Sequence, residues 1–184
     1  MNLNIPYMET DNKLLNDAYR IAAGDIVGNI VYYQNGLLTE EKPCMIAGLD
    51  YNTPWTRDTA INIWNALSIL SPEVSKNTLL AVLEEEEGNI YIGGQYWDSI
   101  IWMIGAREYC RFYKDDNFYR LAFEAGRNSV HRLEEDEFDE EDGLFRGPAV
   151  YGDGIAAYPD KYSKCPNQGS GILEWVDYPG NPVY

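Results

Sequence analysis

Residues 47–59 read Ala-Gly-Leu-Asp-Tyr-Asn-Thr-Pro-Trp-Thr-Arg-Asp-Thr, a turn-rich approach to a predicted helix that holds Trp55, Arg57 and Asp58 together. An indole offers a flat apolar face to the C–H face of a sugar ring, and an arginine and a carboxylate supply charge-assisted hydrogen bonds to hydroxyls. The stretch therefore favours a sugar pocket. An equally good interpretation is that Asp58 is only the N-cap of a helix beginning at Thr59, with Arg57 as its ion-pair partner.

A second stretch repeats this arrangement of glycines, aromatics and an acid at a helix start. Residues 93–102 read Gly-Gly-Gln-Tyr-Trp-Asp-Ser-Ile-Ile-Trp, so Tyr96, Trp97 and Asp98 follow a flexible glycine pair. Glycine allows a backbone to approach a ligand closely. Asp98 as a cap and Trp97 as a core residue would be the structural alternative, but two such junctions in one chain favour substrate binding.

The hydrophobic pattern predicts an all-α fold. Apolar residues recur at helical spacing, and cap or stop residues bound each segment. Helices are expected over about residues 11–33, 59–70, 72–87, 98–113 and from 116 onwards, with Glu84 to Glu87 as a solvated last helical turn. Short links alternate with longer, glycine- and aromatic-rich links, which is typical of antiparallel helical hairpins with functional loops. We expect a single domain over residues 1–184, with an irregular tail over 163–184.

Composition limits the function classes. The 184 residues carry 30 acidic and 14 basic side chains, a formal net charge of −16, so a nucleic acid or an anionic membrane would be repelled. No apolar run approaches the length of a spanning helix, and we expect a soluble chain whose compartment the sequence leaves open. Fifteen tyrosines and five tryptophans suit both helix packing and sugar recognition.

Metal and cofactor sites are not expected. Cys44, Cys110 and Cys165 are widely spaced, and His131 is the single histidine. The acidic stretch 134–142 precedes Gly143, but placing that glycine sixth in an EF-hand loop puts Phe138 first, where a carboxylate is required. A solvated acidic loop is the better interpretation.

A third stretch, residues 143–159, presents one acid among glycines and aromatics. Asp153 lies between Gly152 and Gly154 and close in sequence to Tyr151 and Tyr158. An ordinary turn aspartate is one interpretation. The other is a general acid, since partial burial among aromatics raises the pKa of a carboxyl group.

These three stretches, in this order, resemble the six-hairpin glycosidases, a superfamily that includes trehalases, processing α-glucosidases and glycogen-debranching glucosidases. The resemblance implies about half of an (α/α)6 toroid. It also implies an inverting hydrolase of α-linked glucosides that needs no cofactor. Trp55, Arg57, Asp58, Tyr96, Trp97 and Asp98 would hold the sugar, and Asp153 would protonate the glycosidic oxygen.

Length sets this chain apart from the family pattern. Twelve helices with their connections need roughly 180 to 215 residues. In this chain of 184 residues only five helices are predicted. No counterpart of the general base is evident after Asp153. We expect that a second chain or self-association covers the open flank, or that the chain is a fragment.

Three functions therefore stand after the sequence alone. The first is a partial catalytic domain of an inverting glycoside hydrolase. The second is a non-catalytic carbohydrate-binding or interaction module derived from such a domain. The third is a helical scaffold whose aromatic residues all belong to the core. The first two require the three stretches to converge on one saccharide cavity.

Overall fold

The computed structural model describes residues 5–48, 51–94 and 97–145. The chain divides into two compact units, Met1–Ser129 and Val130–Tyr184. The helices are α1 (Lys13–Gly28), α2 (Thr56–Asn62), α3 (Ser68–Leu70), α4 (Pro72–Ala81), α5 (Asp98–Phe112) and α6 (Asp116–Glu137), with a π-helical turn η1 (Ile63–Leu67) between α2 and α3. The strands are β1 (Ile30–Tyr33), β2 (Lys42–Met45), β3 (Leu83–Glu86), β4 (Asn89–Ile92), β5 (Phe138–Asp139) and β6 (Leu144–Phe145).

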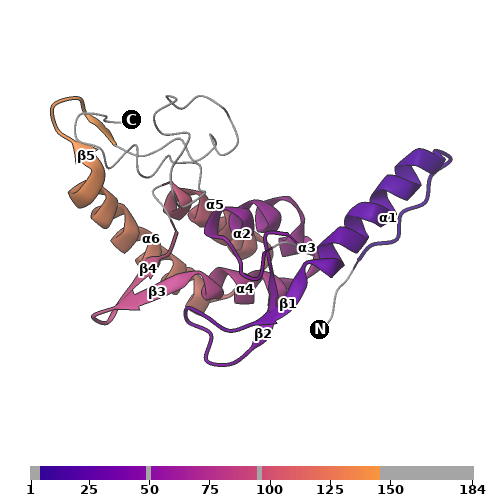
Figure 1. Cartoon of the computed structure of the whole chain (residues 1–184), viewed down its shortest axis with the longest axis horizontal. Coiled ribbons are helices and arrows are strands. Elements are labelled where there is room, and N and C mark those ends of the chain that lie inside the picture. Colours follow the sequence, from indigo (N-terminus) through magenta and orange to yellow (C-terminus); the bar gives the residue numbers. More distant parts are fainter. Residues whose placement is uncertain (1–4, 49–50, 95–96, 146–184) are drawn as a thin grey trace, which may run out of the picture. The chain divides into compact units, whose positions relative to one another are not determined.

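The all-α prediction, and with it half of an (α/α)6 toroid, is wrong. The described residues form a mixed α/β fold in which three antiparallel two-stranded sheets, β1–β2, β3–β4 and β5–β6, accompany the helices (Figure 1). Two of these hairpins occupy stretches for which the sequence predicted the end of a helix. The error thus lies in the segments directly after α1 and α4.

The β3–β4 hairpin replaces the predicted last turn of the third helix. Its two-residue loop is Glu87-Gly88, and both residues have positive φ, 51° and 78°. A loop of this kind twists in the same sense as the strands on either side of it, and glycine adopts positive φ without a steric penalty. Glu84 pairs with Tyr91 and Glu86 with Asn89, so Glu84 to Glu86 lie on a strand, and Glu87 lies in the turn.

The β1–β2 hairpin follows α1 in the same way. The N–H of Asn29 donates to the carbonyl of Asp25 and ends the helix at Gly28. The next four residues, Ile-Val-Tyr-Tyr, are β-branched or aromatic and fit a pleated surface better than a helix. They pair with residues 42–45, where Cys44 is fully buried. Burial raises the pKa of the Cys44 thiol to about 12, so this group stays protonated and structural.

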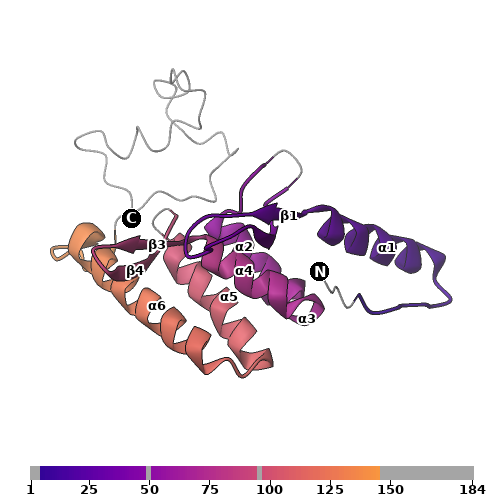
Figure 2. The same ribbon diagram turned by 90° about the horizontal axis from the view of Figure 1, so that it is seen from below.

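The core lies where α2, α4 and α5 pack side by side (Figure 2). Trp102 of α5 is fully buried, and its indole N–H donates to the carbonyl of Leu79 at 3.3 Å. Gly105 faces α2 so closely that an added Cβ would lie 2.7 Å from the Cα of Ala60. The two helices that begin at the predicted sugar-binding junctions are therefore held together at close range.

A loop from the first hairpin caps the end of α4. The N–H of Leu37 donates to the carbonyl of Leu80 at 3.1 Å, and the amide of Asn35 donates to the carbonyl of Ala81 at 3.2 Å. The N–H of Gly93 donates to the carbonyl of Val82 at 2.9 Å. The last carbonyls of a helix lack partners within the helix, so these three donors complete its end.

Asp115 joins α4 and α6. One carboxylate oxygen accepts from the N–H of Phe118 at 3.0 Å, the N-cap geometry, and the other accepts from Lys76 at 2.6 Å. The Lys76 ammonium is the largest influence that lowers the pKa of Asp115, followed by the Phe118 N–H. Tyr109 lies beside the same carboxylate, and burial with that negative charge raises the pKa of its phenol to about 12.

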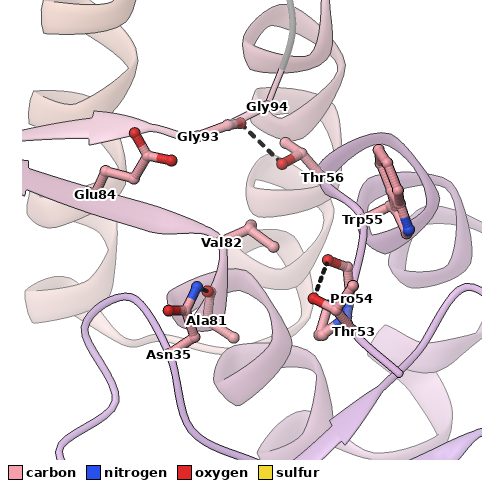
Figure 3. A pocket seen from close by; sticks show the side chains of 10 residues that line it. All are labelled: Asn35, Thr53, Pro54, Trp55, Thr56, Ala81, Val82, Glu84, Gly93 and Gly94. Carbon is pink, nitrogen blue, oxygen red and sulfur yellow. Dashed lines mark hydrogen bonds between the residues drawn. The ribbon is translucent and has the colours of Figure 1, made fainter. Parts of the chain in front are cut away.

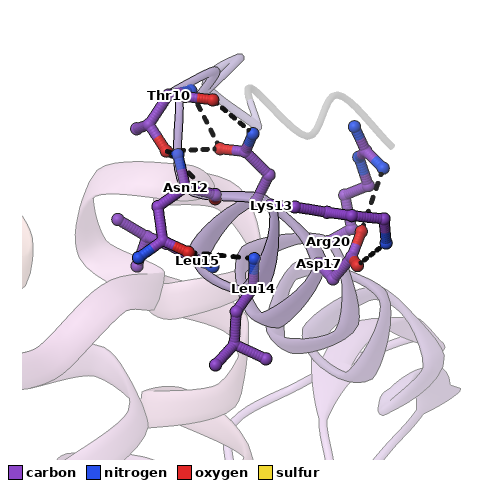
Figure 4. A network of polar contacts seen from close by, with 8 residues as sticks. Thr10, Asn12, Lys13, Leu14, Leu15, Asp17 and Arg20 are labelled. Atoms are coloured by element: carbon purple, nitrogen blue, oxygen red, sulfur yellow. Dashed lines mark hydrogen bonds and ion pairs between the residues drawn. The ribbon is translucent and has the colours of Figure 1, made fainter.

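Helix α1 differs from the other long helices because, of its 16 residues, it buries Asn16 alone. The Asn16 side chain accepts from the N–H and hydroxyl of Thr10, each at 2.9 Å, and Asn12 accepts from the N–H groups of Leu14 and Leu15 (Figure 4). Asn12, and not Asp11 as the sequence suggested, is the N-cap. Leu14, which follows the helical spacing of apolar residues in α1, is 78% exposed.

The second unit contains the C-terminal turns of α6 and the β5–β6 hairpin. The rings of Phe138 and Phe145 lie 5.1 Å apart across the pair, and the Asp139 carboxylate accepts from the N–H groups of Glu141 and Asp142. The acidic stretch thus uses one of its own carboxylates to build the turn.

No group of three or more metal-ligating side chains comes together within the described ranges 5–48, 51–94 and 97–145. None of the helices there is long and apolar enough to cross a bilayer.

Candidate functional site

The first predicted junction forms the start of α2. Trp55 occupies the N-cap position with extended backbone, φ −103° and ψ 140°, and makes no side-chain cap hydrogen bond. The helix begins at Thr56, so Asp58 lies inside the first turn and is not the cap. An acid there is still favoured by the helix dipole. The interpretation of Asp58 as a plain N-cap is therefore wrong.

The second junction forms the start of α5. Trp97 occupies the N-cap position and is partly buried, and Asp98 is the first residue of the helix, 5% exposed. The carbonyl of Trp97 accepts from the N–H groups of Ile100 and Ile101, each at 3.1 Å. Tyr96 lies outside the described residues. Asp98 is the more deeply placed acid of the two junctions, because Asp58 is only partly buried.

An ion pair joins the two junctions. Arg57 Nη1 lies 3.7 Å from Asp98 Oδ1, and the two side chains are 22% and 6% exposed. One interpretation of the sequence made Asp58 the ion-pair partner of its neighbour Arg57. In the structure Arg57 pairs with Asp98, which is 41 positions away. Partial burial strengthens a charge pair of this kind, because water screens it less.

The backbone of the glycine pair completes the connection. The Thr56 hydroxyl donates to the carbonyl of Gly93 at 2.8 Å. Gly94 has φ 111°, and an added Cβ would lie 2.9 Å from both Asp98 and the Thr56 hydroxyl. No larger residue fits there without displacing one of them. The glycines therefore allow β4 to approach the start of α2.

Between these elements lies a pocket of about 230 Å³ (Figure 3). Its lining comes from the loop after β1, the approach to α2, the end of α4 with β3, and the glycine pair, namely Asn35, Thr53, Pro54, Trp55, Thr56, Ala81, Val82, Glu84, Gly93 and Gly94. The mixture of apolar surface with a few polar groups is typical of small-molecule sites. Of the residues predicted from sequence to bind substrate, Trp55 lines this pocket directly.

Trp55 stands at the rim of the pocket. Its side chain is 43% exposed, and the ring of Tyr51 meets it edge-on at 6.1 Å with an interplanar angle of 78°. In Figure 3 the indole is turned away from Glu84 and Asn35, on the other side of the Pro54–Thr56 backbone. A ligand that contacts both the indole and Glu84 must therefore cross the rim.

Glu84 is a lining residue that the sequence reasoning missed. The sequence predicts Glu84 to Glu87 as a solvated last helical turn, in which nothing distinguishes one glutamate from the next. In a strand, successive side chains point to opposite faces, so Glu84 and Glu85 differ in direction. The signal that separates them is the Glu87-Gly88 turn followed by Asn-Ile-Tyr-Ile, a pattern that predicts a hairpin.

The third predicted stretch is represented only by its beginning. Gly143 forms the β5–β6 turn with φ 66°, and Asp153, the candidate general acid, lies outside the described residues. The structure thus brings together parts of two of the three stretches, through Arg57, Asp98, Thr56 and the glycine pair. No protein-family model, no curated protein and no solved structure matches the chain. Functional inference therefore depends on the chemistry of these residues.

Proposed function

We propose that the chain binds a saccharide at the joined starts of α2 and α5. The observation that carries this proposal is the Arg57–Asp98 ion pair, which joins two charged residues at the helix starts where the exposed Trp55 lines a pocket. Neither charged residue belongs to the pocket lining itself. An indole face and oriented charged hydrogen-bonding groups together suit a ring that has an apolar face and a hydroxylated edge. The resemblance of the first two stretches to the six-hairpin glycosidases favours the same ligand class, although the toroid that it implies is not the fold of this chain.

The rim position of Trp55 favours an oligosaccharide over a single sugar. One sugar ring would stack on the exposed indole, and the next would cross the Pro54–Thr56 backbone into the pocket. The chain carries a net charge of −16, which disfavours anionic ligands and leaves neutral saccharides acceptable. The binding partner in this proposal is an oligosaccharide, not a nucleic acid or a membrane.

Titration with glucose, trehalose and maltose, followed by tryptophan fluorescence and calorimetry, tests the proposal. We expect millimolar or tighter binding in the wild type and a loss of about tenfold or more in Trp55→Ala, because stacking on an aromatic ring contributes on the order of 1 kcal/mol or more. Trp64→Ala is the matched control, since Trp64 is 54% exposed on η1 and does not line the pocket. Absence of binding, or equal losses in both variants, would contradict saccharide binding at this site.

Hydrolysis is a second candidate function, favoured by the carboxylates near the pocket. An inverting glycosidase uses two carboxyl groups about 6.5 to 9.5 Å apart, one as the acid and one as the base. Asp98 is paired with Arg57, so its carboxylate is suited to accept a hydrogen bond from a sugar hydroxyl and not to donate a proton. The role of the acid would fall to Asp153.

Turnover separates the two candidates. The hydrolase predicts release of glucose from an α-glucoside by the full chain and its loss in Asp153→Asn, with sugar binding unchanged. The non-catalytic module predicts binding that is lost in Trp55→Ala while Asp153→Asn has no effect on any measured property.

A further inference from the structure

Glu84 is the only ionisable residue among the described residues that line the pocket. Its carboxylate lies against the Gly93 backbone, where an added Cβ would be 2.5 Å from Oε1. Figure 3 shows the carboxylate beside the end of β4, facing the Gly93 side of the pocket. No lysine, arginine or histidine belongs to this described lining. The lining thus presents a negative charge without a cation of its own.

The threonine and asparagine side chains of the pocket already donate hydrogen bonds to backbone carbonyls. Thr56 donates its only hydroxyl proton to Gly93, and Thr53 donates its own to Pro54 at 3.2 Å. The Asn35 amide donates one of its two protons to Ala81. A hydroxyl has a single donor and a carboxylate has none, so the lining offers mainly acceptors.

We propose that this pocket selects an amino sugar, with Glu84 as the counter-ion of its ammonium group. The inference rests on the proposed saccharide site and names the class of sugar that the site prefers. An ammonium group supplies three donors to an acceptor-rich lining, and its charge complements Glu84. A uronic acid would place a second carboxylate near Glu84, so it is the disfavoured ligand.

The experiment compares glucosamine, glucose and glucuronate by calorimetry with the full chain, below the pKa of the amine. We expect the order glucosamine, glucose, glucuronate, with glucosamine bound about tenfold more tightly than glucose, the difference between a charge-assisted and a neutral hydrogen bond. Glu84→Gln keeps the shape of the side chain and should make the first two sugars equal. Glu85→Gln removes a charge from the next residue of the same strand, outside the pocket lining, and should leave the preference intact.

Each outcome bears on one of the two proposals. Equal binding of glucose and glucosamine by the wild type, or a preference that survives Glu84→Gln, would overturn the role of Glu84 while saccharide binding stands. An equal loss of preference in Glu84→Gln and Glu85→Gln would mean that the preference depends on the net negative charge of the strand. That result would also overturn the role of Glu84. Failure of all three sugars and of maltose and trehalose to bind would remove the saccharide site itself. Circular dichroism of both variants verifies the fold, which an exposed strand residue should not disturb.

Discussion

Helices α1 and α5 have nearly the same length, 16 and 15 residues, and both have the apolar spacing of an amphipathic helix. They are used in opposite ways. Helix α5 buries seven residues against its neighbours, whereas α1 buries one and leaves Leu14 and Ile21 largely exposed. Periodicity thus indicates that a helix forms, and the packing partner decides how much that helix contributes to stability.

The largest expected difference concerns apolar side chains. Leu79→Ala should lower the free energy of unfolding by about 2 to 5 kcal/mol, because Leu79 is fully buried beside Trp102 and its loss leaves a cavity. Leu14→Ala on α1 should change it by less than about 0.5 kcal/mol. Urea unfolding of both variants measures the contrast. A large loss in Leu14→Ala would mean that α1 is packed in solution.

Glycines give a contrast of opposite sign. Gly105→Ala should destabilise by about 1 to 3 kcal/mol, because the new Cβ meets the Ala60 backbone at the α2–α5 contact. Gly24→Ala lies in open space on α1 and should stabilise by about 0.5 to 1 kcal/mol through helix propensity. Thermal melts of the two variants should therefore shift in opposite directions. Parallel shifts would contradict the close approach of α2 and α5.

Acidic residues give the smallest contrast. Asp115→Ala removes the cap of α6 and the Lys76 partner and should cost about 1 to 2 kcal/mol, while Asp17→Ala on the exposed face of α1 should cost less than about 0.5 kcal/mol. The pKa of Asp115 is lowered in the folded chain, so its contribution is complete above its ordinary pKa of about 4 and is lost as pH falls through the lower folded pKa. Unfolding curves of wild type and Asp115→Ala should converge in acid. A constant gap between them would contradict the ionic role.

The starts of α5 and α6 were predictable because their signals are local. Asp98 opens α5 as expected, and Asp115 caps α6 through its own side chain. The helical stretch from Thr56 to Leu70 begins three residues earlier than predicted, because Trp55 takes the N-cap position without a side-chain hydrogen bond. Caps that use backbone conformation alone leave little trace in a sequence.

The hairpins and the ion pair were harder to predict for a different reason. The stretches after α1 and α4 are compatible with a continued helical pattern. Tertiary packing, such as burial of Cys44, favours strands in these stretches instead. Glycines, aromatics and acids marked both junctions of the candidate site. Arg57 finds Asp98 only because α2 and α5 lie side by side, and Glu84 faces the pocket only because it lies on a strand. No local pattern indicates the ion pair, and only the Glu87-Gly88 turn followed by Asn-Ile-Tyr-Ile indicates the strand that carries Glu84.

The hydrogen bonds that secure the beginning of α1 span at most six positions, from Thr10 to Asn16. Closing such short loops takes far less time than bringing Thr56 to Gly93, which are 37 positions apart. The N-terminal cap should accordingly be among the first structures to form as the chain folds, while the cleft between the two junctions is completed late. The proposed saccharide site would then exist only after the tertiary pairing of α2 with α5, so ligand binding at that site would report the final folding step.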